Sequence, residues 1–216
     1  MRGDAAHYVH SKLMAWLALD RTLRMADTHR TSAVRRARWA AERDAIASDV
    51  IANGLDPDRG NFVRAYGRRD LDAALLVLPL IGLEPPESAR VVGTVKAVRS
   101  ELSAGGPLLY RYPPGDDGLP GDEGAFLPCS FWLAQAEAAT GAVDEAIGLF
   151  EQLVGMAEPL GLYAEEADPG SGALLGNHPQ AFTHATLVQA ALAIRDATKH
   201  RATPPAPRRT RRGRSS

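Results

Sequence analysis

The chain has one cysteine, few aromatic residues and no long apolar run among its 216 residues. A single cysteine, Cys129, allows neither a disulfide framework nor a thiolate metal cage, and its place between Phe126 and Phe131 predicts a small buried filler. No window reaches the roughly 18 apolar residues of a membrane helix, and Met1–His10 lacks the apolar core of a signal peptide. These absences predict a cytoplasmic protein with no membrane partner.

Acidic residues are absent from the end of the chain, where residues 201–216 contain six arginines. The remaining residues, 1–200, carry 19 basic and 26 acidic side chains. This excess of negative charge argues against a body that binds nucleic acid. We therefore expect one globular unit over residues 1–200 and a disordered basic tail over residues 201–216.

Apolar residues recur at helical spacing along most of the chain, and strand patterns are almost absent. Thr31 or Ser32 can cap a second helix, Asp70 a third and Ser88 a fourth. The predicted helices cover about 11–29, 32–53, 70–81, 88–105, 124–139, 143–157 and 180–199. The apolar helix 70–81 should be buried on most of its circumference. Its alternation with amphipathic helices favours an all-α toroid of inner and outer helices.

Two loops between helices, residues 110–126 and 161–169, gather the polar groups that could perform chemistry. Carboxylates, an arginine and aromatic rings on loops of a helical scaffold suit a cleft that hydrolyses sugars. Each group also has a structural interpretation, as a loop salt bridge, a helix cap or a solvated charge pair. The six candidate residues are Arg111, Asp116, Asp117, Glu123, Glu165 and Glu166.

Several short motifs follow one another in a fixed order over about residues 1–195. They are His7–Trp16, Asp70–Ala73, Arg111–Tyr112, Asp117–Leu119, Glu123–Leu127, Cys129–Trp132, Gly161–Leu162, Glu165–Glu166, Asp168–Pro169 and Leu175–His184. In this order they resemble glycoside hydrolase family 15, the glucoamylases and bacterial trehalase-like enzymes. The resemblance implies an (α/α)6 barrel of twelve helices. Seven predicted helices would then form a partial (α/α)6 barrel, the C-terminal part of the catalytic domain.

The resemblance also implies which carboxylates act. Inverting hydrolysis needs one acid to protonate the leaving oxygen and one base to activate water. Glu165 matches the base of the family, with Glu166 as the alternative. The acid of the family is the glutamate of a Trp-Glu pair that comes just before a segment resembling Met1–Gly3. The match begins at Met1, so the general acid is expected to be absent and the chain alone inactive.

The expected substrates are α-glucosides, either trehalose or the ends of α-glucans, and no cofactor is expected. By resemblance Arg111 contacts sugar hydroxyls, and Asp116, Asp117, Glu123 and Glu166 are further candidates for such contacts. No metal site is expected, because the histidines (His10, His178 and His184 among them) lack the spacing of a zinc helix.

The exposed edge of a partial barrel predicts self-association. Two alternatives remain open. The chain could be a catalytically inactive remnant, or a helical scaffold that binds carbohydrate or protein. Residues 131–150 look like one unit of a tetratricopeptide-type array, but no second copy lies 34 residues away on either side.

Overall fold

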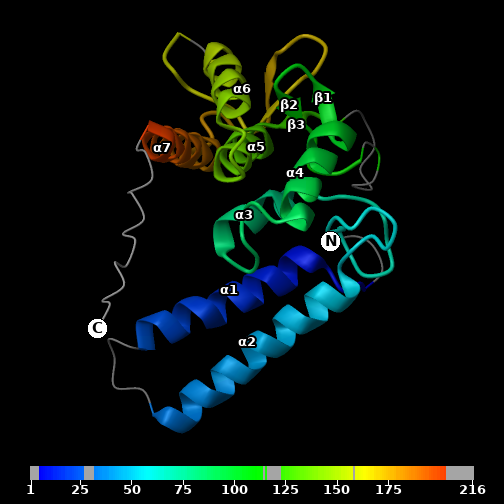
Figure 1. Ribbon diagram of the computed structural model, residues 1–216. Helices are drawn as coiled ribbons and strands as arrows, with labels where there is room; N and C mark the ends of the chain where they lie inside the picture. The colour runs from blue at the N-terminus through cyan, green and yellow to red at the C-terminus, as the bar shows by residue number, and fades with distance from the viewer. Residues whose placement is uncertain (1–4, 27–31, 114, 116–122, 158, 203–216) are drawn as a thin grey trace, which may run out of the picture.

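The computed structural model describes residues 5–26, 32–113, 115, 123–157 and 159–202. Within these ranges the protein has seven α-helices, one 3₁₀ turn and five very short strands. The predicted number of helices and the helical class are therefore confirmed. Figure 1 shows a lower layer, the α1–α2 hairpin, and an upper layer that contains α5, α6 and α7.

Helices α1 (Val9–Ala26) and α2 (Ala33–Asn53) lie side by side along the lower edge of the molecule (Figure 1). Ser32 caps α2, as predicted, because its side chain accepts a hydrogen bond from the Arg35 amide. The buried Asp20 contacts basic residues of both helices. Thr31, the other predicted cap, lies outside the described residues.

The predicted apolar helix 70–81 is replaced by a 3₁₀ turn, η1 (Ala73–Val77), which leads into the short α3 (Leu78–Ile81). The cap is Asp72 and not Asp70, because the Asp72 carboxylate accepts the Ala74 amide at 2.7 Å. Asp70 instead pairs with Arg64 at 3.2 Å. The prediction that this segment is buried is confirmed, since most of its side chains are at most 3% exposed.

Helix α4 (Ala89–Glu101) is capped by Ser88, as predicted, but ends before residue 105. The reason is a small antiparallel hairpin, in which β1 (Ser103–Gly105) pairs with β2 (Leu108–Leu109). The turn is Gly106–Pro107, and both Gly106 and the preceding Gly105, at the end of β1, have a positive φ, which favours glycine. This hairpin places Arg111 directly above η1, where the Arg111 carbonyl accepts the Ala73 amide at 3.0 Å.

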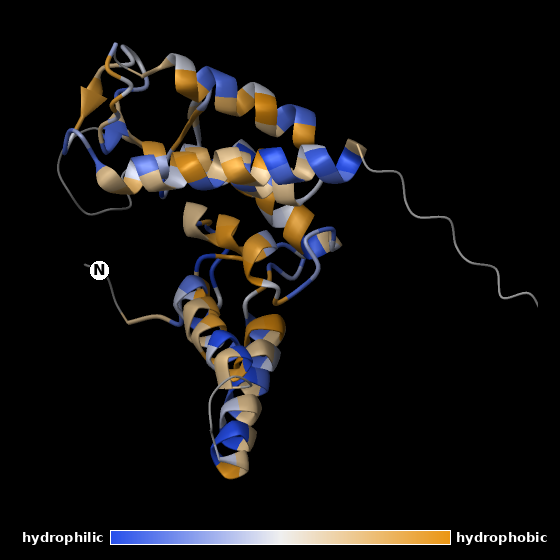
Figure 2. Cartoon of the chain, turned by 90° about the vertical axis from the view of Figure 1, so that its left-hand side faces the viewer, coloured by the Kyte–Doolittle hydropathy of each residue, from blue (hydrophilic) through white to orange (hydrophobic). Residues whose placement is uncertain are grey.

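Helix α5 (Leu127–Ala139) is the centre of the upper layer and packs against α6 (Val143–Gly155) and α7 (Ala181–Ala202). It also contacts η1, α3 and α4, so it is buried on nearly every side. The hydropathy colouring shows apolar residues concentrated where these elements meet (Figure 2). The predicted start at residue 124 is wrong, because Ala125–Phe126 forms a strand, β3.

No helix in the described part of the chain is long and apolar enough to cross a membrane. The predicted basic tail falls almost entirely on residues outside the described ranges.

Candidate active site

A three-stranded antiparallel sheet joins the two loops that carry the candidate residues. Its strands are β3 (Ala125–Phe126), β4 (Glu166–Ala167) and β5 (Leu174–Leu175), with β4 in the middle. Ala125 pairs with Ala167 and Phe126 with Glu166. The end of the first loop is therefore hydrogen-bonded to the second loop, although about 40 residues separate them in the sequence.

Glu165 immediately precedes β4 and is fixed at both backbone and side chain. Its amide donates to the Asn177 carbonyl at 3.0 Å, and its carbonyl accepts the Leu127 amide at 3.1 Å. The Glu165 Oε2 atom accepts a hydrogen bond from Asn177 Nδ2 at 2.7 Å and lies 3.4 Å from the Asn177 amide nitrogen. A partly exposed carboxylate held in this way keeps one oxygen, Oε1, for a water molecule or a substrate.

Gly176 lies directly against Glu165. Its φ of 73° favours glycine, and a Cβ atom there would lie 3.0 Å from Glu165 Cβ and 3.1 Å from Oε2. The glycine therefore leaves the space that the Glu165 side chain occupies.

The side chain of Glu166 lies in a different place from that of Glu165, over the start of β3. A Cβ atom added to the buried Gly124 would lie 2.6 Å from Glu166 Oε2, so this carboxylate covers the Gly124 backbone. Gly124 directly follows Glu123 in the chain. Glu166 thus faces the first loop, whereas Glu165 is held by the β5–α7 connection.

Arg111 is anchored to the buried Asp72, whose Oδ1 accepts Arg111 Nε at 2.7 Å. The same oxygen accepts the Ala74 amide, so Asp72 both caps η1 and orients the arginine. The guanidinium lies 5.2 Å from the Tyr112 ring centre and 5.8 Å from that of Trp132. Within the described residues its terminal nitrogens make no other hydrogen bond, so they can bind a ligand.

His10 of α1 joins this cluster. Burial lowers the pKa of His10, and Arg111 acts in the same direction, whereas Asp72 opposes both. The imidazole is therefore neutral near neutral pH, and it can accept as well as donate a hydrogen bond.

The predicted residue Glu123 is close to the same cluster. Burial raises the pKa of the Cys129 thiol, and the charges of Arg111, Asp72 and Glu123 also act on it. Cys129 is fully buried, so the prediction of a filler is confirmed. Arg111 and Glu123 therefore both lie within electrostatic range of the buried Cys129.

A cavity of about 410 Å³ adjoins the Arg111 cluster, although Arg111 itself does not line it. Its lining includes His10 and Trp132, which also belong to the Arg111 cluster, and the polar side chains of Arg21, Gln135 and Gln189. This volume lies in the range of small-molecule sites. Glu165 does not line this cavity.

Two residues that hold the site together, Asp72 and Asn177, were not among the predicted site residues. Asp116 and Asp117 lie outside the described residues. Asp72 and Asn177 were part of the motifs but had no predicted role. The roles of Asp72 and Asn177 depend on contacts between residues far apart in the sequence, which a local sequence pattern does not reveal.

In the described part of the chain, no group of three or more His, Cys, Asp or Glu residues could hold a metal ion.

Comparison with known proteins shows which family and which relatives the chain is similar to. The family model described as Glycosyl hydrolases family 15 matches residues 1–192. The trehalase of Mycobacterium tuberculosis is 44% identical over 195 residues, which cover 90% of this chain and 28% of the trehalase. The trehalase of Thermoplasma acidophilum is 38% identical over 197 residues, with coverages of 91% and 33%. The chain thus spans about a third of the length of these relatives.

Solved structures show the same fold at low identity. A structure named Glycosidase Wild Type has a TM-score of 0.72 and 22% identity, and the match covers 88% of this chain and 52% of that one. The glucoamylase from Saccharomycopsis fibuligera has a TM-score of 0.74 and 10% identity, with coverages of 91% and 57%.

Proposed function

Because this chain belongs to glycosyl hydrolases family 15, we propose that it supplies the base half of an inverting α-glucosidase site, with Glu165 as the general base. The observation that carries this proposal is the fixed carboxylate of Glu165, held by Asn177 on a sheet that also holds the Arg111 loop. A general base must be oriented toward one water molecule, and the Asn177 bond limits the rotation of the carboxylate.

In this proposal Arg111, together with the cavity that adjoins its cluster, supplies the sugar-binding side of the site. Asp72 fixes the guanidinium through Nε, so the two terminal nitrogens can donate to neighbouring hydroxyls of a glucosyl ring. The neutral His10 and the Trp132 ring line the cavity next to Arg111. Glu123 and Glu166 are proposed as additional acceptors of hydroxyl hydrogen bonds, together with Asp116 and Asp117.

We propose that the general acid belongs to a polypeptide segment outside this chain. Inversion needs a second carboxyl about 6.5–9.5 Å from the base, across the glycosidic bond. The matched relatives are about three times as long as this chain, which supports the proposal. In this proposal the seven helices form part of a twelve-helix barrel, with α5 as an inner helix, and the other part brings the acid.

Trehalose is the first substrate to test, because relatives 44% and 38% identical to this chain are named trehalases. Ends of α-glucans remain the second candidate, because the solved structures of the same fold include glucoamylases.

A substrate that needs no acid tests the proposal directly. α-D-glucosyl fluoride has a leaving group that departs without protonation, so a site with a base alone can hydrolyse it. The chain should release fluoride and β-glucose, the inverted product, and should not cleave trehalose or maltose. Glu165→Gln should abolish fluoride release, whereas Glu151→Gln, an exposed residue of α6, should not affect it.

The outcomes separate the parts of the proposal. Rapid trehalose hydrolysis by the chain alone would refute the missing acid. Unchanged fluoride release in Glu165→Gln would refute the base. If the folded chain releases no fluoride but binds glucose saturably, the carbohydrate-binding remnant replaces the enzyme.

A further inference from the structure

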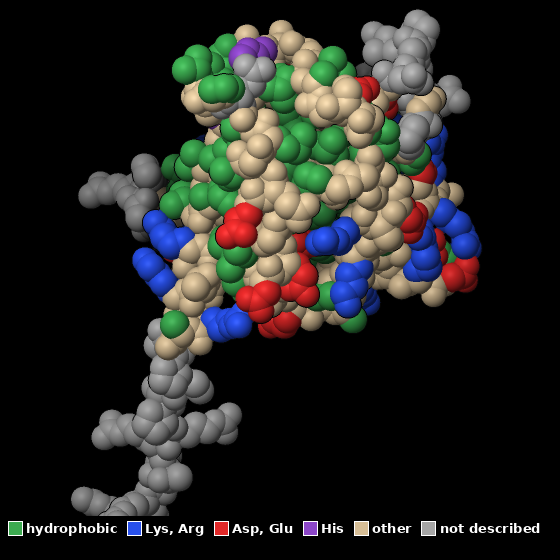
Figure 3. All heavy atoms as spheres, turned by 90° about the horizontal axis from the view of Figure 1, so that it is seen from above, with side chains coloured by type: hydrophobic (Ala, Val, Ile, Leu, Met, Phe, Trp, Pro, Cys, Tyr) green, Lys and Arg blue, Asp and Glu red, His purple; other side chains and the backbone are tan. Residues whose placement is uncertain are grey.

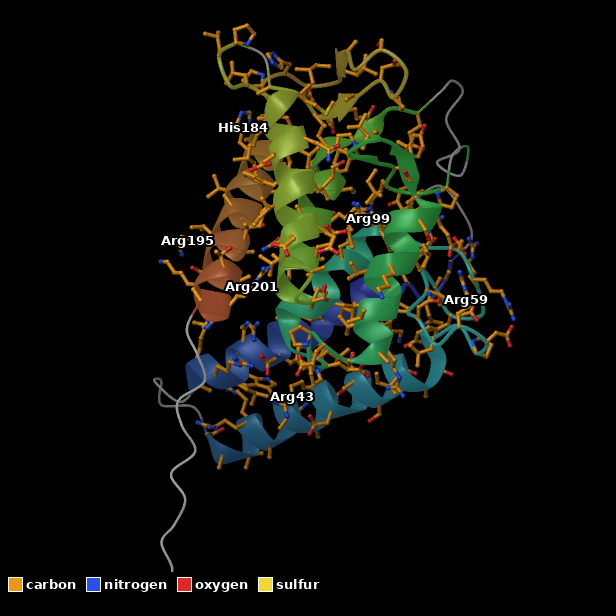
Figure 4. The ribbon with its side chains drawn as sticks, turned by 45° about the horizontal axis from the view of Figure 1, so that its top comes forward. Arg43, Arg59, Arg99, His184, Arg195 and Arg201 are labelled. Atoms are coloured by element: carbon orange, nitrogen blue, oxygen red, sulfur yellow. The ribbon has the colours of Figure 1, made fainter. Side chains whose placement is uncertain are left out.

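A groove of about 540 Å³ lies between α4 and the α5–α6 hairpin, and none of its lining residues belongs to the candidate active site. Figure 4 shows Arg99 in this region, pointing from α4 toward α6. The groove is lined by Val92, Val95, Lys96, Arg99, Glu137, Thr140, Ala142 and Glu145.

Glu137 is the most unusual residue of the groove. It is 4% exposed and is the one ionisable side chain of α5 besides Cys129, in a helix that is otherwise almost wholly apolar. One oxygen, Oε1, accepts a hydrogen bond from Arg99. The other, Oε2, is buried and has no hydrogen-bond partner among the described residues. Buried carboxylate oxygens are normally satisfied, so this atom lacks a donor that a ligand could supply.

The two walls of the groove carry charges of opposite sign. Both cations, Lys96 and Arg99, belong to α4, whereas both carboxylates, Glu137 and Glu145, belong to the α5–α6 hairpin. Figure 3 shows acidic and basic side chains next to one another on the face seen from above. Within the described part of the chain, neither Lys96 nor Glu145 forms a hydrogen bond or an ion pair. Two charges of opposite sign are therefore available on opposite walls.

The charges of the two walls determine which class of ligand the groove can bind. A simple anion would be repelled by the two carboxylates, and a simple cation would be repelled by Lys96 and Arg99. A molecule with an ammonium and a carboxylate a few ångströms apart satisfies both walls. The half-buried Val92 and the buried Val95 add an apolar surface for an aliphatic side chain.

We propose that the α4–α5–α6 groove binds a free aliphatic α-amino acid, with its carboxylate on Lys96 and Arg99 and its ammonium on Glu137 Oε2 and Glu145. The Arg99 side chain is half exposed, so it can turn from Glu137 toward the ligand carboxylate and uncover Oε2. The ammonium then replaces the guanidinium as the partner of Glu137.

Titration calorimetry of the full chain with L-valine tests this proposal. Valine should bind saturably. Isovalerate, which lacks the ammonium, and isobutylamine, which lacks the carboxylate, should each bind at least about tenfold more weakly, because each leaves one wall unpaired. Equal binding of isovalerate and valine would refute the role of the carboxylates, and no heat with valine at millimolar concentrations would refute the site.

Two variants and one control test the residues. Glu137→Gln keeps the shape of the side chain and should reduce valine affinity at least about tenfold, as should Lys96→Ala. Glu151→Gln, on the exposed side of α6, should bind valine like the parent chain. Circular dichroism establishes that each variant is folded. A folded Glu137→Gln protein with full affinity would show that Glu137 has a structural role alone, and would overturn the proposal.

Discussion

Asp72 Oδ1 accepts both Arg111 Nε and the Ala74 amide, each at 2.7 Å. One buried carboxylate oxygen therefore connects the cap of η1 to the guanidinium proposed to hold the sugar. Stability and ligand binding should both depend on this atom.

Asp72→Ala should lower the free energy of unfolding by about 3 kcal/mol or more, because it removes a helix cap and leaves the mostly buried Arg111 without its anion. Urea denaturation measures the loss. The matched control is Asp144→Ala, which breaks the 2.8 Å pair with Arg201 between two exposed side chains. That loss should stay below about 1 kcal/mol. Equal losses in the two variants would contradict the anchoring role of Asp72.

Gly176→Ala tests how closely the backbone approaches Glu165. Both Gly176 and Gly172 have a φ of 73°, so alanine at either position should cost about 1–2 kcal/mol of unfolding free energy. At Gly176 the new Cβ would also lie 3.0 Å from Glu165 Cβ, whereas at Gly172 it would meet nothing within 4 Å. Hydrolysis of α-D-glucosyl fluoride should therefore fall strongly in Gly176→Ala and remain near the parent rate in Gly172→Ala. Equal rates would show that the position of Glu165 does not depend on this contact.

Glu137 predicts a pH-dependent stability. Burial raises its pKa above the ordinary value of 4.5, although Arg99 opposes this. The folded state thus binds this proton more tightly than the unfolded chain. The resulting stability is complete below the ordinary pKa and is lost as the pH rises through the raised pKa. Glu137→Gln does not titrate, so its stability relative to the parent chain should increase as the pH rises above 4.5, the ordinary pKa of the carboxyl. A constant or falling difference, measured by urea denaturation without amino acids, would contradict this sign.

Helix α7 exposes apolar side chains that predict self-association. Phe182, Val188 and Leu192 are 44%, 53% and 44% exposed. We expect the 23.1 kDa chain to elute from a sizing column earlier than a monomer, and more so at higher concentration. The double substitution Val188→Lys and Leu192→Lys should shift the elution toward the monomer. A parent chain that elutes as a monomer at every concentration would contradict the prediction.

The caps and periodicity of the helices could be predicted from the sequence because they depend on neighbours within one turn. Ser32 and Ser88 cap their helices as expected. The start of α5 was misplaced because Ala125–Phe126 pairs with β4, a partner about 40 residues away. The prediction that Asp70 is the cap was wrong for a similar reason, because the Asp70 carboxylate forms an ion pair with Arg64.

The residue types of the candidate site could be predicted from the sequence, but the hydrogen-bond partners that hold these residues could not. Motif resemblance pointed to Arg111 and Glu165. Their partners, Asp72 and Asn177, follow from the contact between η1 and the β2 loop and from the β4–β5 hairpin. Glu137 could have been noticed, because a charged residue stands alone in an apolar helix.

The strands β3, β4 and β5 are each two residues long, yet β4 pairs with both of the others. The end of the first loop, Ala125–Phe126, is therefore joined through Glu166–Ala167 to the second loop and to β5, despite their separation in the chain. A chimera that imports one of the two loops from a homologous enzyme would leave mismatched strand edges, so grafting experiments need to transplant both together.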